Sequence, residues 1–140
     1  IRTTPRQSYR GLNIITHEYP GFPTDLQALM SVFLTQAKGE SRIFETIFEG
    51  RLGHLETLAR MGAKINIHNQ HQATIVGPTP LSGHTVISPD LRAGLAYLLA
   101  GLIAKGQTVI HNVHYIDRGY EQIDKRLGRI GFNIKRHYSL

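Results

Sequence analysis

The chain has 140 residues, a formal net charge of +6 and no cysteine. This length is enough for one domain with its own core, and the absence of cysteine excludes disulfides and thiolate chemistry within these residues. No apolar run reaches the ~18 residues of a membrane span, so no membrane partner is expected. The basic balance indicates either an anionic partner or merely a solvated basic surface. The sequence begins with Ile1 rather than methionine, which suggests a processed or excised piece.

The first 22 residues are expected to form an approach segment, with a short strand at 12–16. The stretch from Thr24 to Gln27 has the T-x-x-Q form of a capping box, which predicts the start of a helix. The apolar residues that follow have helical spacing and predict an amphipathic helix that ends near Gly39. They are Leu26, Leu29, Met30, Phe33, Leu34 and Ala37.

The next elements alternate between β-prone and helical stretches. Residues 42–47 are β-prone, a helix is predicted over 52–61 before Gly62, and strands are predicted at 65–67, 73–76 and 85–87. Ser88 and Pro89 resemble an N-cap followed by proline at the first helical position. A leucine-rich helix then ends at Gly106. A strand at 107–113, a helix at 123–130 and a last strand at 132–138 complete the α/β pattern.

Four landmarks recur in order along the chain, at offsets of 65 to 69 residues. Asp25-Leu26 matches Asp90-Leu91, Ala37-Lys38-Gly39 matches Ala104-Lys105-Gly106, Arg51 matches Arg118, and Met61-Gly62-Ala63 matches Ile130-Gly131-Phe132. This order predicts two copies of one helix–strand–helix–strand unit, over residues 23–87 and 88–140, in a closed pseudo-symmetric arrangement. The alternative is that these matches arise by chance, because the same residue types commonly end helices and strands in α/β proteins.

Arg51, Arg92 and Arg118 each lie where a helix is predicted to begin. A cation at a helix N-terminus opposes the macrodipole, so stability alone would not favour this placement. A guanidinium beside a helix N-terminus suits a phosphate or carboxylate ligand. Local ion pairs with Glu49 or Asp117 explain Arg51 and Arg118 equally well.

Asp25 and Asp90 lie in the first turns of predicted helices, where an acid is favoured for electrostatic reasons alone. The rigid PGFP segment before Asp25 tips the interpretation of that residue towards a general base or a hydroxyl-binding carboxylate. The eight histidines do not form a ligand set: His68 with His71 and His111 with His114 would point to opposite faces of a strand, so no metal is predicted. Glycine-rich nucleotide loops are absent, and basic patches lack interleaved aromatics, so no nucleic acid is expected.

Six motifs occur along the chain in this order: PGFPTDLQ, ETIFEGR, RMGA, DLRA, LAG and YIDRGYE. Together they resemble the C-terminal part of the UDP-N-acetylglucosamine enolpyruvyl transferases (1-carboxyvinyltransferases), in the EPSP synthase-like superfamily. The match extends from about Pro20 to Lys135. The resemblance implies an inverted α/β barrel, with helices inside and sheets outside. Residues 1–140 would hold about two of the three repeat units of one incomplete domain.

The family's reaction transfers enolpyruvyl from phosphoenolpyruvate to the 3-hydroxyl of UDP-N-acetylglucosamine, the first committed step of peptidoglycan synthesis. Phosphate leaves through a tetrahedral addition intermediate. The resemblance implies a cytoplasmic transferase that uses no cofactor. Its partners would be the two substrates and the missing N-terminal catalytic domain.

The resemblance assigns the site residues by motif. Asp25 would contact the sugar hydroxyl and act as its base, and Ile47 would bind the UDP-sugar through a backbone group. Arg51, Arg92 and the catalytic Arg118 would surround the phosphate and carboxylate of phosphoenolpyruvate. Asp90 would be a further polar group near the intermediate. Such cations stabilise charge that develops in the transition state.

Several departures from the family pattern keep alternatives open. The family commonly has Asn at Gly50 and bulkier residues at Leu52 and Gly53, and it differs at Gly94 and Tyr97. The changes at Gly50 and Gly53 support a degenerate homologue that binds UDP-sugar or a protein partner without catalysis. A sister transferase acting on shikimate 3-phosphate is a further alternative, although its acid- and lysine-containing motif is not seen. The family's catalytic Cys lies in the other domain, so we predict no turnover by these residues alone. We also expect exposed sheet edges and self-association.

Overall fold

The computed structural model describes residues 8–138. The elements, in chain order, are β1 (Asn13–Ile15), α1 (Thr24–Gln36), β2 (Gly39–Phe44), α2 (His54–Arg60), β3 (Lys64–Ile67), β4 (Gln72–Gly77), β5 (Thr85–Ile87), α3 (Leu91–Ile103), β6 (Val109–His111), α4 (His114–Asp117) and α5 (Ile123–Arg129). The mixed α/β content agrees with the prediction. None of the described helices is long and apolar enough to cross a membrane.

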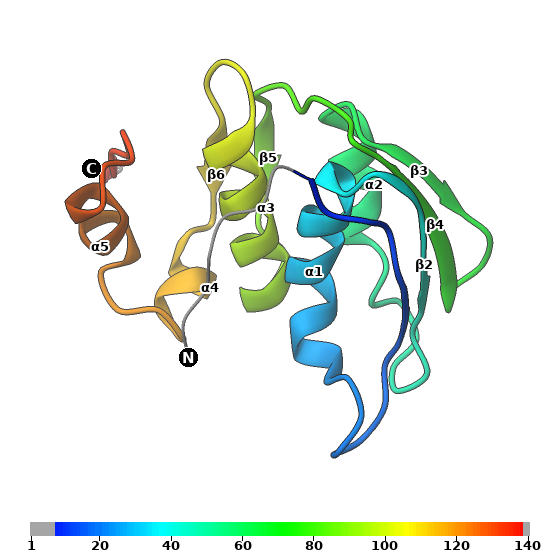
Figure 1. Ribbon diagram of the computed structural model, residues 1–140. Helices are drawn as coiled ribbons and strands as arrows, with labels where there is room; N and C mark the ends of the chain where they lie inside the picture. Colours follow the sequence, from blue (N-terminus) through cyan, green and yellow to red (C-terminus); the bar gives the residue numbers. More distant parts are fainter. Residues whose placement is uncertain (1–7, 139–140) are drawn as a thin grey trace.

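The strands form two separate sheets. The larger has the order β1-β2-β4-β3, in which β1 and β2 are parallel and the other pairs are antiparallel. The smaller is the parallel pair β5 and β6. In Figure 1, helices α1, α2 and α3 lie between the large sheet and the small sheet, and α5 lies at the far edge beside the C-terminal segment.

The core lies between the large sheet and these helices because one face of each strand is apolar. Ile43 of β2 and Ile75 of β4 are fully buried, whereas their neighbours Phe44 and Val76 point outward. This is the period-2 alternation of a half-buried sheet. The sheet packs closely on α1: a Cβ on Gly77 would meet the backbone carbonyl of Ala37, so this position admits only glycine.

Helices α1 and α3 run side by side and begin at the same, lower end of Figure 1. The buried side of α1 differs from the predicted stripe. Leu26 and Phe33 are exposed, while Ser31 and Thr35 are fully buried. The Thr35 hydroxyl donates to the backbone carbonyl of Val32. The Ser31 hydroxyl has two acceptors within reach, the carbonyl of Gln27 and Nε2 of His54, so burial of both polar residues is tolerable. Because α1 is surrounded on several sides, apolar spacing alone did not identify its inner face.

Two predicted helix caps are wrong. Pro23 is the N-cap of α1, and Thr24 is already helical and makes no capping bond. At α3 the N-cap is Asp90, not Ser88, and its carboxylate accepts from the backbone N–H groups of Arg92 and Ala93. In contrast, the end of α2 at Gly62 agrees with the prediction: Gly62 has φ 110°, a conformation that favours glycine.

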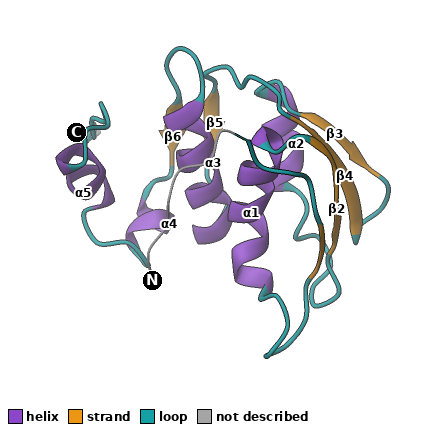
Figure 2. Ribbon diagram, in the orientation of Figure 1, coloured by secondary structure: helices purple, strands orange, loops and turns teal. Residues whose placement is uncertain are grey.

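The C-terminal part also differs from the prediction. Residues 132–138 contain no strand, and Figure 2 shows them beside α5 as loop. Arg136 anchors this segment instead, with a bidentate pair to Asp117 at 2.7 Å and 2.7 Å and a contact to Asp124 at 3.3 Å. These hydrogen bonds hold the pKa of Asp117 below its usual range. The short helix α4, which overlaps the start of the IDRGYE motif, was not predicted.

Candidate functional site

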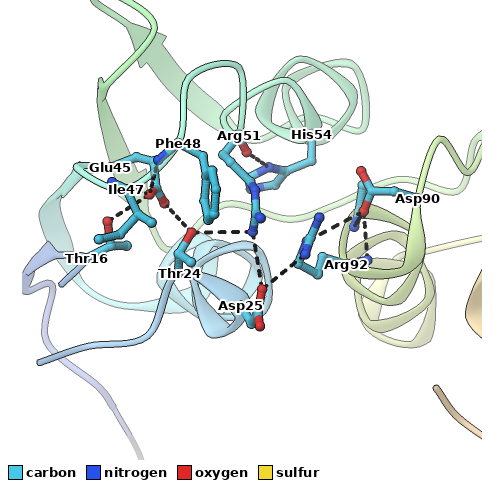
Figure 3. A network of polar contacts seen from close by, with 11 residues as sticks. Thr16, Thr24, Asp25, Glu45, Ile47, Phe48, Arg51, His54, Asp90 and Arg92 are labelled. Atoms are coloured by element: carbon cyan, nitrogen blue, oxygen red, sulfur yellow. Dashed lines mark hydrogen bonds and ion pairs between the residues drawn. The ribbon is translucent and has the colours of Figure 1, made fainter. Parts of the chain in front are cut away.

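A cluster of charged side chains joins the N-terminal ends of α1 and α3. The Nη1 atoms of Arg51 and Arg92 lie 3.2 Å and 3.1 Å from the same oxygen, Oδ1 of Asp25 (Figure 3). Asp25 is in the first turn of α1, Arg92 is in the first turn of α3, and Arg51 is in the turn before α2. We call Asp25, Arg51, Asp90 and Arg92 the arginine–aspartate cluster.

Each arginine of the cluster is held from a second side. The Nη1 of Arg51 is 3.4 Å from the hydroxyl of Thr24, and its guanidinium lies 4.2 Å above the centre of the Phe48 ring. Arg92 approaches Asp90 at 4.0 Å. The Arg51 side chain is only 19% exposed, whereas that of Asp25 is 69% exposed. The more fixed partner is therefore the cation, and the carboxylate lies at the solvent side.

A cavity of about 450 Å³ lies against the cluster. Its walls come from the starts of α1 and α3, the turn at 49–53 and helix α2, and they include Thr24, Gln27, Arg51, His54, Asp90, Arg92 and Tyr97. Two helix N-termini and two guanidinium groups face this region and favour an anion, whereas the carboxylates of Glu49 and Asp90 on the same wall oppose one. Gln27 is almost fully buried, and its Nε2 has no hydrogen-bond partner within residues 8–138. The wall of the cavity thus contains a donor that none of the described residues satisfies.

His54 is buried beneath Arg51. Its Nδ1 is 3.0 Å from the carbonyl oxygen of Arg51, and its Nε2 is 3.1 Å from the hydroxyl of Ser31. A carbonyl can only accept, so Nδ1 carries the hydrogen. Burial lowers the pKa of His54 to about 4, outweighing the opposing effect of the Arg51 carbonyl. A neutral imidazole therefore supports the backbone of Arg51 at neutral pH.

The remaining predicted site residues lie outside the cluster. The backbone N–H of Ile47 donates to Glu45 at 3.0 Å, and Ile47 does not line the cavity. Arg118 follows α4 rather than preceding a helix, is exposed, and makes no ion pair with any residue in the range 8–138. The next residue, Gly119, lies against the side chain of Leu91, the first residue of α3. Arg118 is thus on a loop that packs beside the cluster without joining it.

Sequence reasoning missed two buried polar residues at the site, Glu45 and His54. Both had a signal in the sequence. Side chains two residues apart on an extended strand point to the same face. Glu45 therefore lies on the same face as Ser41 and Ile43, and the alternation that buries Ile43 also directs Glu45 inward. His54 precedes Leu58 by four residues and so shares its buried helix face. Among the described residues, no group of three or more His, Asp or Glu side chains is arranged to hold a metal ion.

Comparison with known proteins agrees with the resemblance. The chain is 48% identical to the UDP-N-acetylglucosamine 1-carboxyvinyltransferase of Methylacidiphilum infernorum, covering 99% of this chain and 33% of that protein. It is 46% identical to the enzyme of the same name from Gluconacetobacter diazotrophicus, covering 97% of this chain and 32% of that protein. The chain therefore spans about a third of the length of the curated relatives it matches.

Solved structures agree with the fold. The crystal structure of the enolpyruvyl transferase NikO from Streptomyces tendae superimposes with a TM-score of 0.85 at 27% identity, over 94% of this chain and 30% of that one. EPSP synthase from Acinetobacter baumannii gives a TM-score of 0.64 at 20% identity, over 91% of this chain and 29% of that chain, which supports the fold alone. The mixed α/β segment thus matches part of the enolpyruvyl transferase fold. The sequence matches the EPSP synthase (3-phosphoshikimate 1-carboxyvinyltransferase) family over residues 1–127, and the chain belongs to that family.

Proposed function

We propose that this chain forms part of an enzyme that transfers enolpyruvyl from phosphoenolpyruvate to the 3-hydroxyl of UDP-N-acetylglucosamine in the cytoplasm. The observation that carries the proposal is the meeting of Arg51 and Arg92 on one carboxylate oxygen of Asp25, at the start of two parallel helices. The names of the 46–48% identical relatives favour this substrate over shikimate 3-phosphate.

In the proposed mechanism, the two arginines bind the phosphate and carboxylate of phosphoenolpyruvate. In the free chain Asp25 occupies the position between them, so an anionic ligand replaces Asp25 as their counter-ion. The released carboxylate then accepts the proton of the sugar hydroxyl as its oxygen bonds to C2 of phosphoenolpyruvate. The C2–C3 double bond opens and C3 takes a proton from an acid that the second domain would supply, which gives the tetrahedral intermediate. Loss of a proton from C3 then restores the double bond and expels phosphate. Arg118 would complete the anion site, and Asp90 would hold Arg92 and the start of α3. Ile47 would contribute a backbone group to the UDP-sugar.

The proposal also covers the organisation of the complete protein. The chain would hold about two of three repeat units, 23–87 and 88–140, of one inverted barrel, with the catalytic cysteine supplied by a second domain. The parallel pair β5 and β6 has no further strand within residues 8–138, and Ile87 and Val109 on it are exposed. A two-stranded sheet is marginal by itself. Further strands would cover it in the complete protein, and self-association would do so in the isolated chain.

Titration calorimetry of the 140-residue chain tests the role of Asp25. We expect Asp25→Asn to weaken UDP-N-acetylglucosamine binding about tenfold, because a charge-assisted hydrogen bond to the sugar hydroxyl is lost. The same variant should bind phosphoenolpyruvate at least as tightly as the parent chain, because a neutral amide competes less for the arginines than the carboxylate does. Glu40→Gln, at an exposed acid paired with Arg42, is the matched control.

The two ligands should respond to Asp25→Asn in opposite directions, and this difference separates the proposed function from its alternatives. Loss of both ligands in Asp25→Asn would contradict the proposed exchange, and binding of neither ligand by the parent chain would contradict the proposed function of the chain's site. Salt-steep DNA binding would instead support a nucleic-acid partner. A degenerate homologue would bind the sugar nucleotide but not phosphoenolpyruvate.

A phosphate-release assay tests the expectation that the chain is incomplete. With both substrates present, the 140-residue chain should release no phosphate above background, because the catalytic cysteine would come from the second domain. Measurable turnover would show that the chain carries a complete site and would overturn the proposed division between two domains.

A further inference from the structure

Glu45 is a fully buried acid beside the arginine–aspartate cluster. Its Oε1 accepts from the hydroxyl of Thr16 at 3.0 Å and from the backbone N–H groups of Ile47 and Phe48 at 3.0 Å and 3.2 Å. Its Oε2 accepts from the hydroxyl of Thr24 at 2.8 Å. Within residues 8–138 no Lys, Arg or His forms an ion pair with it. A buried acid without a cation is rare and is satisfied here by hydrogen bonds alone.

The two carboxylate oxygens make different connections. Oε1 ties the end of β1 to the loop after β2, and this loop carries Phe48, on which the Arg51 guanidinium lies. Oε2 reaches the cluster itself through Thr24. Because the Thr24 hydroxyl gives its hydrogen to Glu45, its oxygen lone pairs are left to accept from the Nη1 of Arg51. The same Nη1 then reaches Asp25 (Figure 3).

We infer that Glu45 is a positioning residue for Arg51: its carboxylate fixes the direction of the Thr24 hydroxyl and the place of Phe48, and so sets where the guanidinium points. What the positioned Arg51 binds rests on the proposed function, whereas the positioning itself does not. Glu45 touches no ligand-facing atom of the cluster, so it acts only through Thr24 and Phe48.

A carboxylate is required at this position because of the direction of the hydrogen bonds. In Glu45→Gln, the amide oxygen can still accept from Thr16 and the two backbone N–H groups. The amide nitrogen would then face the Thr24 hydroxyl and donate to it. The Thr24 hydroxyl has two lone pairs and could accept from this amide and from Arg51, but its own hydrogen would have lost the acceptor that fixes its direction. The volume and most of the packing are kept, but the contact to Arg51 is disfavoured.

The test is NMR measurement of rotation about the Nε–Cζ bond of Arg51 in the 140-residue chain, together with its affinity for phosphoenolpyruvate. We expect Glu45→Gln and Thr24→Val to speed this rotation and to weaken binding, each about tenfold, as loss of a hydrogen bond to a charged group would. The double variant should be no worse than either single one, because both act on the same contact. Thr24→Ser, which keeps the hydroxyl, should retain slow rotation, and Glu40→Gln is the control at an exposed acid.

Unchanged Arg51 rotation in Glu45→Gln and Thr24→Val would overturn the inference, even if both variants were less stable, since burial alone would then explain Glu45. If Glu45→Gln does not fold, Thr24→Val decides by the same measurement. If the parent chain does not bind phosphoenolpyruvate, the proposed function fails for this chain, while the rotation rates still decide the role of Glu45.

Discussion

Replacing Arg51 by alanine is expected to weaken phosphoenolpyruvate binding roughly 100-fold, as loss of a hydrogen-bonded contact between a largely buried guanidinium and an anion would. Arg51 is the more buried of the two arginines at Asp25, with its side chain 19% exposed compared with 37% for Arg92. Its charge is screened less by water and salt, so it should matter more than Arg92. Titration calorimetry at two salt concentrations measures the loss of affinity in each arginine variant and how strongly that loss depends on salt.

Two comparisons make this result specific. Arg42→Ala removes the same charge from an exposed pair with Glu40 and should change binding little, so an equal loss in both variants would indicate only a general charge effect. Arg51→Lys keeps the charge but not the planar group that lies over Phe48 and reaches Thr24 and Asp25 together. We expect it to resemble alanine more than arginine. Unchanged affinity of Arg51→Ala for phosphoenolpyruvate would show that Arg51 does not bind this substrate.

The second large effect is a loss of stability between pH 6.5 and pH 4, caused by His54. The pKa of His54 is lowered to about 4 in the folded chain, so the unfolded chain binds this proton first as the pH falls. Protonation of the unfolded state then favours unfolding. The free energy of unfolding should therefore fall by roughly 3 kcal/mol across this window because of His54 alone, and stay constant above it.

Urea unfolding of the chain at pH 7 and pH 4.5 measures this effect. His54→Gln has no proton to bind and should lose much less stability over the same interval, although it starts lower at pH 7 because the contacts to Arg51 and Ser31 change. His84→Gln, at an exposed histidine, should follow the parent chain. Parallel curves for the parent chain and His54→Gln would show that His54 is not the group responsible.

The sequence predicted most of the elements because their signals are local. Apolar spacing and glycine stops identified α1, α2, α3 and α5, and alternation identified β3 and β4. The prediction of a strand at 132–138 is wrong because an alternating sequence does not show which strand it would pair with. The Arg136 side chain holds this segment, in place of backbone hydrogen bonds to a neighbouring strand. The capping box at Thr24 failed for a similar reason, since a distant acid, Glu45, takes its hydroxyl.

The site was predicted in part, and the missing parts were those that depend on tertiary structure. Motif resemblance singled out Asp25, Arg51, Asp90 and Arg92, which the fold brings together from three segments. It could not show that Asp25 lies between the two arginines, because that contact joins α1 to α3 across 67 residues. Three arginines were expected to surround one anion site. Arg51 and Arg92 line the cavity together, whereas Arg118 follows a short helix and does not line it. The assignments of binding roles remain predictions.

The anchoring of the C-terminal segment by Arg136 has a consequence for how the molecule opens. Charge pairs weaken as ionic strength rises, whereas burial of apolar surface does not. Arg136, Asp117 and Asp124 retain partial exposure, so dissolved ions reach this anchor while they do not reach the core. Salt would therefore loosen residues 132–138 at Arg136 as a local event, while Ile134 keeps its packing on the cluster of Leu95, Leu98 and Ile116. Because Arg118 adjoins Asp117, the ionic composition of the medium would also govern how firmly that arginine is presented.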